Sequence, residues 1–165
     1  MVVACTGHRP QKLFGYEKTH PGYVWLKERM KYYLAYRKAD EGISGMALGA
    51  DLIFCEAIME LKAQGYPIKL HCAIPCLNHK AKWNNNSEWI KIYDAATNIA
   101  ETVKIVTELP YNQFVMDVRN HYMVDRCDNI MAIYDGSGGG TANCIRYAKE
   151  KEKHIDILNP NQFKK

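Results

Sequence analysis

Short apolar runs alternate along this chain with longer stretches in which apolar side chains recur every three or four residues. An apolar run of four to seven residues is typical of a buried strand, and the wider spacing is typical of a helix with one apolar side. The apolar runs predict strands over residues 2–6, 43–46, 68–74, 103–107, 130–134 and 154–158. The helical spacing predicts helices over residues 23–37, 50–61, 87–100, 114–126 and 141–152.

Regular alternation of strands and helices is typical of a parallel sheet covered on both faces. We therefore predict an α/β fold, namely a single Rossmann-like three-layer domain over residues 1–165 with a mainly parallel sheet of about six strands. The one long irregular stretch, residues 77–86, is polar and is predicted to be a surface loop. Because ligands of such sheets bind beyond the carboxyl ends of the strands, the residues that follow each strand are the first candidates for function.

The composition predicts a chain that forms its own core in water. Of the 165 residues, 47% are hydrophobic and 24% are charged. A chain of this length buries roughly 68–70% of its unfolded surface, so metals or disulfides are not needed to hold the core. No apolar run approaches the ~20 residues that span a bilayer, and the first residues lack the character of a signal peptide. We expect a cytoplasmic protein with six reduced cysteines and no membrane partner.

Positive charge is in slight excess and is spread along the chain. There are 22 Lys and Arg against 18 Asp and Glu, which gives a formal net charge of +4. The densest basic run, residues 149–153, alternates Lys with Glu, as is typical of a solvated helix face. Nucleic-acid-binding domains more often gather Lys and Arg on one face, so we expect nucleic acid to be an unlikely partner.

A cluster of His and Cys residues lies at positions 71–79, but its spacing does not follow a zinc-binding pattern. Its first part falls in a predicted strand, where neighbouring side chains point to opposite faces. We expect no metal site here, and no motif in the chain requires a cofactor.

Gly7, His8 and Arg9 follow the first predicted strand. Glycine permits a tight turn and a close approach of the backbone to a ligand. The guanidinium of arginine suits bidentate contact with phosphate or carboxylate. These residues predict a ligand contact, and a plain turn with exposed polar side chains is the alternative.

Gly45, Gly49 and Asp51 follow the second predicted strand. The segment contains neither the dinucleotide fingerprint nor a P-loop. Its glycines would still let the backbone approach a ligand, and the next helix would aim free N–H groups at that ligand. Asp51 either caps this helix or accepts hydrogen bonds from a ribose or base.

Three consecutive glycines, Gly138, Gly139 and Gly140, precede Thr141 between the fifth predicted strand and a helix. Ordering them costs more backbone entropy than ordering other residues. That cost is reasonable where backbone N–H groups must surround a phosphate, and Thr141 would add a hydroxyl donor. A flexible loop is the alternative.

Arg119 and Asn120 lie with Met123 on one side of the predicted helix over residues 114–126. The polar pair forms either a buried hydrogen-bonded network or a ligand contact, and we favour the ligand contact. Asp125 and Asp128 stand near the helix end, where a carboxylate is unfavourable to the helix dipole. A role other than helix stability is therefore expected for these two carboxylates.

These motifs resemble those of the YpsA-like family, which belongs to the SLOG superfamily of Rossmann-like domains. The resemblance covers nearly the whole chain and rests on residues 7–10, 45–51, 73–75 followed by Trp83, 119–120, 123–125, and 139–141 with Asn143. It implies a nucleotide-sized ligand at the strand ends, such as a nucleoside phosphate or an ADP-ribose-like signal. It also implies a homo-oligomer, as is frequent among related SLOG proteins.

The superfamily also holds the LOG phosphoribohydrolases, which split a nucleoside monophosphate into base and ribose 5-phosphate with an Arg and a Glu. In this chain Arg119 matches the Arg, whereas Asn120 stands in place of a Lys and Cys144 in place of the Glu. Because the carboxylate is missing there, the resemblance leaves open whether the protein is an enzyme.

Three functional hypotheses follow. The first is a sensor or sequestering protein that binds a nucleotide, with Arg9 and Arg119 adding charge to the glycine-rich turns. The second is a nucleoside 5′-monophosphate N-glycosidase of LOG type, in which Asp51, Asp125 or Asp128 replaces the absent Glu and Arg119 positions the phosphate or ribose. Under this hypothesis Arg119 and Asp125 are the candidate catalytic residues. The third is single-stranded DNA binding as in the SLOG member DprA, for which 11 tyrosines and three tryptophans supply aromatic rings.

Overall fold

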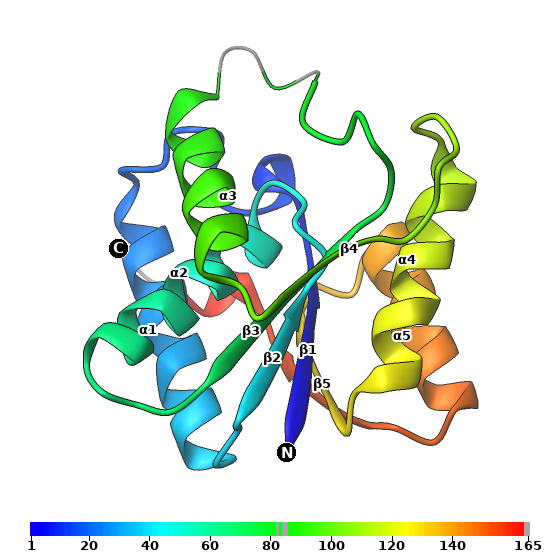
Figure 1. The fold of residues 1–165 in the computed structure, drawn as a ribbon. Coiled ribbons are helices and arrows are strands. Elements are labelled where there is room, and N and C mark those ends of the chain that lie inside the picture. The colour runs from blue at the N-terminus through cyan, green and yellow to red at the C-terminus, as the bar shows by residue number, and fades with distance from the viewer. Residues whose placement is uncertain (82, 84–85, 164–165) are drawn as a thin grey trace.

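The computed structural model describes residues 1–81, 83 and 86–163, and the described chain forms one parallel sheet with helices on both sides (Figure 1). The sheet has six strands in the order β4-β3-β2-β1-β5-β6. The strands are β1 (Val2–Gly7), β2 (Glu41–Ser44), β3 (Lys69–Ile74), β4 (Thr102–Ile105), β5 (Asn129–Ile133) and β6 (His154–Leu158). The predicted surface loop over residues 77–86 lies in part, at residues 82, 84 and 85, outside the described residues.

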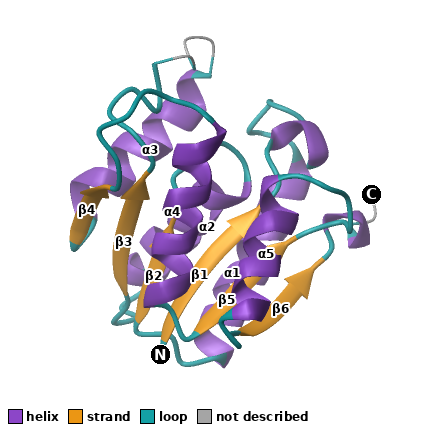
Figure 2. Ribbon diagram, turned by 90° about the vertical axis from the view of Figure 1, so that its right-hand side faces the viewer, coloured by secondary structure: helices purple, strands orange, loops and turns teal. Residues whose placement is uncertain are grey.

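Five α-helices form the two outer layers of the described fold (Figures 1 and 2). On one face lie α1 (Pro21–Tyr36), α2 (Ala50–Ala63) and α3 (Ser87–Ile99), and on the other lie α4 (Gln113–Arg126) and α5 (Gly140–Glu150). Two short 3-10 helices, η1 (Pro10–Lys12) and η2 (Pro160–Gln162), follow β1 and β6. This arrangement confirms the predicted α/β, Rossmann-like three-layer fold.

The strand order places a switch point beside β1. The chain builds β1, β2, β3 and β4 outward to one edge, then returns through α4 to place β5 on the free side of β1. In open parallel sheets a crevice forms at such a reversal, beyond the carboxyl ends of the two strands. Here the reversal brings the segment after Gly7 next to the segment after Ile133, because these residues are register partners.

Apolar side chains fill both interfaces between the sheet and the helices. The larger core lies under α1, α2 and α3 and includes Leu26, Met30, Phe54, Ile58 and Trp89. The smaller core lies under α4 and α5 and includes Ala4, Met123, Ile130 and Ile145. All six cysteines are buried and free of disulfides, as the composition predicted. No helix in the described ranges is both long enough and apolar enough to cross a bilayer.

Two strands, β2 and β4, end two residues before their predicted limits, whereas the other four match their predicted limits to within one residue. β2 ends at Ser44 rather than continuing to Met46. Met46 adopts a left-handed φ of 63°, and its N–H donates a hydrogen bond to the Ser44 hydroxyl at 3.2 Å instead of to a neighbouring strand. β4 ends at Ile105, and all four of its residues are exposed. It lies at the edge of the sheet, and its apolar side chains are not buried on both faces of the sheet.

Gly7→Ala should destabilise the fold. A Cβ atom at Gly7 would lie 2.8 Å from the Cβ of Ile133 and closer still to that of Ala50, and both neighbours belong to ordered elements. We expect the free energy of unfolding, measured by urea denaturation, to fall by about 1–3 kcal/mol. Gly138→Ala is the control, because a Cβ there meets nothing within 4 Å and should change stability by less than about 0.5 kcal/mol. Equal losses in both variants would contradict the tight packing.

Candidate functional site

A cavity of about 290 Å³, the first cavity, opens at the switch point where β1 and β5 end. Its walls come from the segment after β1, the β2–α2 turn, the loop before α4, α4 itself and the run of residues 138–140 at the start of α5, here called the glycine loop. It is lined by Thr6, Gly7, His8, Arg9, Gln11, Lys12, Ala47, Asp51, Tyr111, Gln113, Met116, Arg119, Asn120, Gly138, Gly139, Gly140 and Thr141.

Most residues that the sequence predicted to contact a ligand come together at this cavity. Those that line it are Gly7, His8, Arg9, Asp51, Arg119, Asn120, Gly138, Gly139, Gly140 and Thr141. Gly45, Gly49 and Asp125 are not among the lining residues. The strand–helix pattern therefore predicted where the cavity lies. The role of each lining residue depends on its contacts.

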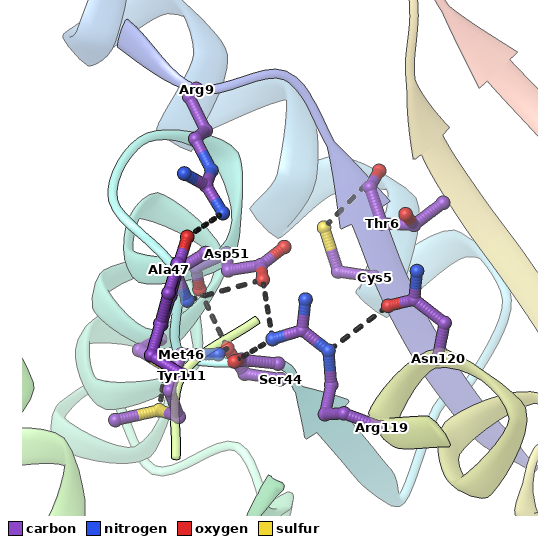
Figure 3. A network of polar contacts seen from close by, with 12 residues as sticks. Cys5, Thr6, Arg9, Ser44, Met46, Ala47, Asp51, Tyr111, Arg119 and Asn120 are labelled. Carbon is purple, nitrogen blue, oxygen red and sulfur yellow. Dashed lines mark hydrogen bonds and ion pairs between the residues drawn. The ribbon is translucent and has the colours of Figure 1, made fainter. Parts of the chain in front are cut away.

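Arg119 is a buried cation that reaches from α4 to the β2–α2 turn (Figure 3). Its Nη1 donates to the carbonyl of Gly45 and lies 3.8 Å from a carboxylate oxygen of Asp51. Its Nε donates to Oδ1 of Asn120 at 2.9 Å. Nη2 makes no hydrogen bond within the described residues, so its donors are available to a ligand in the first cavity.

Asp51 is buried beside Arg119 and is held by the turn that it follows. Its Oδ2 accepts a hydrogen bond from the amide of Ala47 at 3.2 Å. Burial raises the pKa of Asp51 and lowers the pKa of Arg119, and the opposite charge of each partner counters the shift in the other. Asp51 does not cap α2, since the N-cap position is Gly49.

Gly45 and Gly49 make room for protein atoms. A Cβ at Gly45 would lie 2.6 Å from Nη1 of Arg119 and 2.7 Å from Oδ2 of Asp51. A Cβ at Gly49 would lie 2.6 Å from the carbonyl oxygen of His8, and Gly49 has a φ of +93° that disfavours other residues. In this structure both glycines permit close packing around the ion pair and the start of α2.

His8 joins the ends of β1 and β5 behind the cavity. Its Nε2 lies 2.7 Å from Oδ1 of Asp135, and its backbone carbonyl accepts a hydrogen bond from Ala50 at 3.1 Å. Asp135 also accepts a hydrogen bond from the amide of Ser137 at 2.8 Å. Contacts from Ser137, followed by those from His8, hold the pKa of Asp135 well below its usual range. His8 thus positions the glycine loop.

The glycine loop leads directly into α5 and presents its first amides. Gly139 is the N-cap with a φ of 138°, and its position carries no side-chain cap. Within the described residues the amides of Gly140, Thr141 and Ala142 have no hydrogen-bond acceptor. Free amides at a helix N-terminus favour an anion, because the helix dipole adds to their partial positive charge.

Sequence reasoning missed Lys12, which stands at the mouth of this loop. Its Nζ donates to the hydroxyl of Ser137 at 2.9 Å and to the carbonyl of Gly138 at 2.8 Å. Tyr111, also missed, comes from the loop before α4 and accepts a hydrogen bond from Nη2 of Arg9 at 3.1 Å. The position of Lys12 just after the first strand was a usable signal, whereas no pattern marked Tyr111.

The other acidic candidates lie away from the first cavity. Asp125 accepts a hydrogen bond from the hydroxyl of Tyr147 at 2.9 Å, between α4 and α5. Asp128 accepts one from the amide of Val2 at 2.7 Å, at the opposite end of the sheet. Cys144 is buried, and burial raises the pKa of its thiol to about 11. Of the carboxylates considered for glycosidic cleavage, the structure brings only Asp51 to the first cavity.

A second cavity of about 330 Å³ adjoins the first. The two share Arg9, Gln11, Ala47 and Tyr111 as a common wall. The second cavity is otherwise lined by Tyr16, Leu48, Asn78, His79, Trp83 and Asn86. The sequence did not predict it, because its walls come from segments without a common motif.

Two solved DprA structures share this fold. The X-ray structure of DNA processing protein A from Streptococcus pneumoniae matches with a TM-score of 0.60 and 16% identity, over 94% of this chain and 49% of that one. The protein from Helicobacter pylori matches with a TM-score of 0.62 and 18% identity, over 96% of this chain and 65% of that one. The chain thus spans about half of one DprA chain and under two thirds of the other.

The H. pylori structure is described by its single-stranded DNA binding mode. The expectation that nucleic acid is an unlikely partner is therefore wrong. It rested on the small net charge of the whole chain, whereas a protein described by its single-stranded DNA binding mode shares this fold. Overall charge balance does not exclude nucleic acid here.

Sequence comparison finds relatives among bacterial proteins. An uncharacterized SPbeta prophage-derived protein, YoqJ of Bacillus subtilis, is 35% identical over 117 residues, which cover 66% of this chain and 68% of the relative. A UPF0398 protein of Bacillus thuringiensis is 26% identical over 163 residues, which cover 94% of this chain and 85% of the relative. The family model YpsA matches residues 3–163. Since that match spans nearly the whole sequence, the chain belongs to the YspA SLOG family, as its motifs had suggested.

Proposed function

We propose that this protein binds a nucleotide or a nucleotide-derived ligand, such as a nucleoside phosphate or an ADP-ribose-like molecule, with its phosphate groups in the first cavity. The observation that carries the proposal is the convergence of Arg9, Lys12 and Arg119 with the glycine loop on one cavity. The protein then acts as a sensor or as a sequestering protein for that ligand.

The charges of the first cavity favour an anionic ligand. Asp51 is the one carboxylate among its described lining residues, and it already faces Arg119. Arg9 and Lys12 contact only neutral oxygens in the hydrogen bonds described above. A phosphate would complement these two cations and the free amides at the start of α5.

Titration calorimetry with a panel of nucleoside mono-, di- and triphosphates, NAD and ADP-ribose tests this proposal. We expect saturable binding of at least one member and competition by its phosphate-bearing fragment. Mass spectrometry of small molecules that co-purify with the protein would identify the natural ligand. Folded protein that binds no member of the panel, and carries no phosphorylated molecule, would rule the proposal out.

Single-stranded DNA is a second candidate, favoured by the aromatic rings beside the cationic cavity. Tyr16, Trp83 and Tyr111 line the second cavity next to Arg9, and base stacking on aromatic rings beside a cationic groove is a common mode of single-strand binding. The DprA likeness supports the same candidate. Fluorescence anisotropy of a labelled thymidine oligonucleotide tests it. We expect the logarithm of the binding constant to fall linearly with the logarithm of the salt concentration. No binding at low ionic strength would remove this candidate.

Lys12→Met should weaken phosphate binding without unfolding the protein. Within the described residues the hydrogen bonds of Lys12 go to Ser137 and Gly138 at the surface. A hydrogen bond to a charged group contributes roughly 1.5–3 kcal/mol, so affinity should fall about tenfold or more. Lys149→Met, at an exposed lysine of α5 outside the cavity, is the matched control. Calorimetry measures both variants, and equal affinities would show that Lys12 does not contact the phosphate.

Arg119→Met should lower both stability and ligand affinity, and adding Asp51→Asn should recover part of the stability alone. Removing one partner of a buried ion pair costs about 3–5 kcal/mol, because the other charge remains buried. Burial raises the pKa of Asp51 and the charge of Arg119 lowers it, so loss of Arg119 raises it further and the folded variant binds a proton at a higher pH than the native protein. The stability deficit of Arg119→Met should therefore shrink as pH falls from 7.5 to 5.

Urea denaturation at both pH values measures these effects, and calorimetry measures ligand affinity. Asp51→Asn alone serves as the control for loss of the carboxylate. A double variant no more stable than Arg119→Met would contradict the pairing. A double variant that regains full ligand affinity would show that Arg119 holds the fold but not the phosphate.

A further inference from the structure

The first and second cavities together form one two-part site with a shared wall. Arg9 and Tyr111 line both, and the hydrogen bond from Arg9 to the Tyr111 hydroxyl lies at their junction. Small-molecule sites commonly have volumes of about 300–1,000 Å³, so each cavity alone is at the lower end of that range. A whole nucleotide needs more space than its phosphate group does. The two cavities together therefore suit a nucleotide better than either one alone.

The two parts differ sharply in chemistry. The first contains the cations and the glycine loop, whereas the second contains the rings of Tyr16, Trp83 and His79. Apart from the shared Arg9, no described residue of the second cavity carries a full charge at neutral pH, because His79 is neutral there. Burial, reinforced by the nearby Arg119 and Arg9, lowers the pKa of His79 to about 3.

The ring surfaces of the second cavity are held in place by packing. The ring centroids of His79 and Trp83 are 5.0 Å apart in a T-shaped arrangement, and both rings also contact Tyr93 of α3. His79 is buried, and its Nδ1 has no hydrogen-bond partner among the described residues. An uncharged wall of fixed aromatic rings favours a planar, neutral group over a sugar or a phosphate.

We infer that the second cavity binds the nucleobase of the ligand whose phosphate lies in the first cavity. The inference rests on the proposed function and adds the place of the base, so that a base-bearing nucleotide binds more tightly than a phosphate or a sugar phosphate alone. Asn78, Asn86 and Gln11 supply amide groups at the edge of the ring-lined wall, where they can pair with the polar edge of a base. Arg9 sits between base and phosphate, at the junction of the two cavities.

The test compares ligands with and without a base. Calorimetric affinities are measured for AMP, GMP, CMP, UMP, ribose 5-phosphate and inorganic phosphate. Base stacking predicts that at least one nucleotide binds about tenfold more tightly than ribose 5-phosphate. An oligonucleotide of thymidines is compared with dTMP, so that a free nucleotide and a base within a DNA strand are distinguished.

Two variants assign the difference to the second cavity. Tyr16 is half exposed, and among the described residues its hydroxyl bonds to Gln11 alone, so Tyr16→Ser should leave the fold intact. It should lower nucleotide affinity about fivefold or more and leave ribose 5-phosphate unchanged. Tyr32→Ser, at an exposed tyrosine of α1 outside both cavities, is the matched control. Nucleotides should also quench tryptophan fluorescence in the native protein but not in Trp83→Phe.

The outcomes separate this inference from the proposed function. Equal binding of ribose 5-phosphate and the nucleotides, with Tyr16→Ser unchanged, would overturn the base site while phosphate binding in the first cavity stands. Weaker binding of every phosphate-bearing ligand in Lys12→Met, together with weaker binding of nucleotides alone in Tyr16→Ser, would support both. Absence of binding by every ligand would overturn both.

Discussion

The candidate site depends on one buried cation. Arg119 carries its charge from α4 to the turn between β2 and α2, where it meets the Gly45 carbonyl and the Asp51 carboxylate. A buried guanidinium is costly to desolvate, and these partners offset that cost and hold the side chain in place. They also fix the position of α4 relative to the start of α2. Both ends of this link, Asp51 and Arg119, line the first cavity.

The same pair leaves the surface cations of the first cavity without a compensating charge. Asp51 is buried beside Arg119, so its negative charge is balanced inside the protein and does not compensate the cations at the surface. Arg9 and Lys12 instead contact a hydroxyl or a carbonyl, each of which a phosphate oxygen can replace as acceptor. The candidate site therefore combines a buried ion pair with surface cations whose partners are neutral.

The sequence predicted the order of strands and helices because the apolar period depends only on neighbouring residues. It also predicted the place of the site, since parallel strands bring their following segments to one edge. It could not distinguish a glycine that admits a ligand from one that admits protein atoms. Gly45 and Gly49 face Arg119 and the His8 carbonyl, which come from distant segments. Lys12 was missed for a related reason, as its target is the glycine loop 125 residues further along the chain.

The error about nucleic acid has a physical cause that bears on any small binding domain. A net charge of +4 is a sum over 165 residues, whereas a phosphate at the surface responds mainly to charges within a Debye length of roughly 8 Å at physiological salt. The relevant quantity is the local set of Arg9, Lys12 and Arg119, and that set is the same for a free nucleotide and for a phosphate in a DNA strand. Charge alone therefore cannot separate the two ligands. What can separate them is whether the aromatic cavity beyond Arg9 accepts one base as an end group or lets a chain of bases pass.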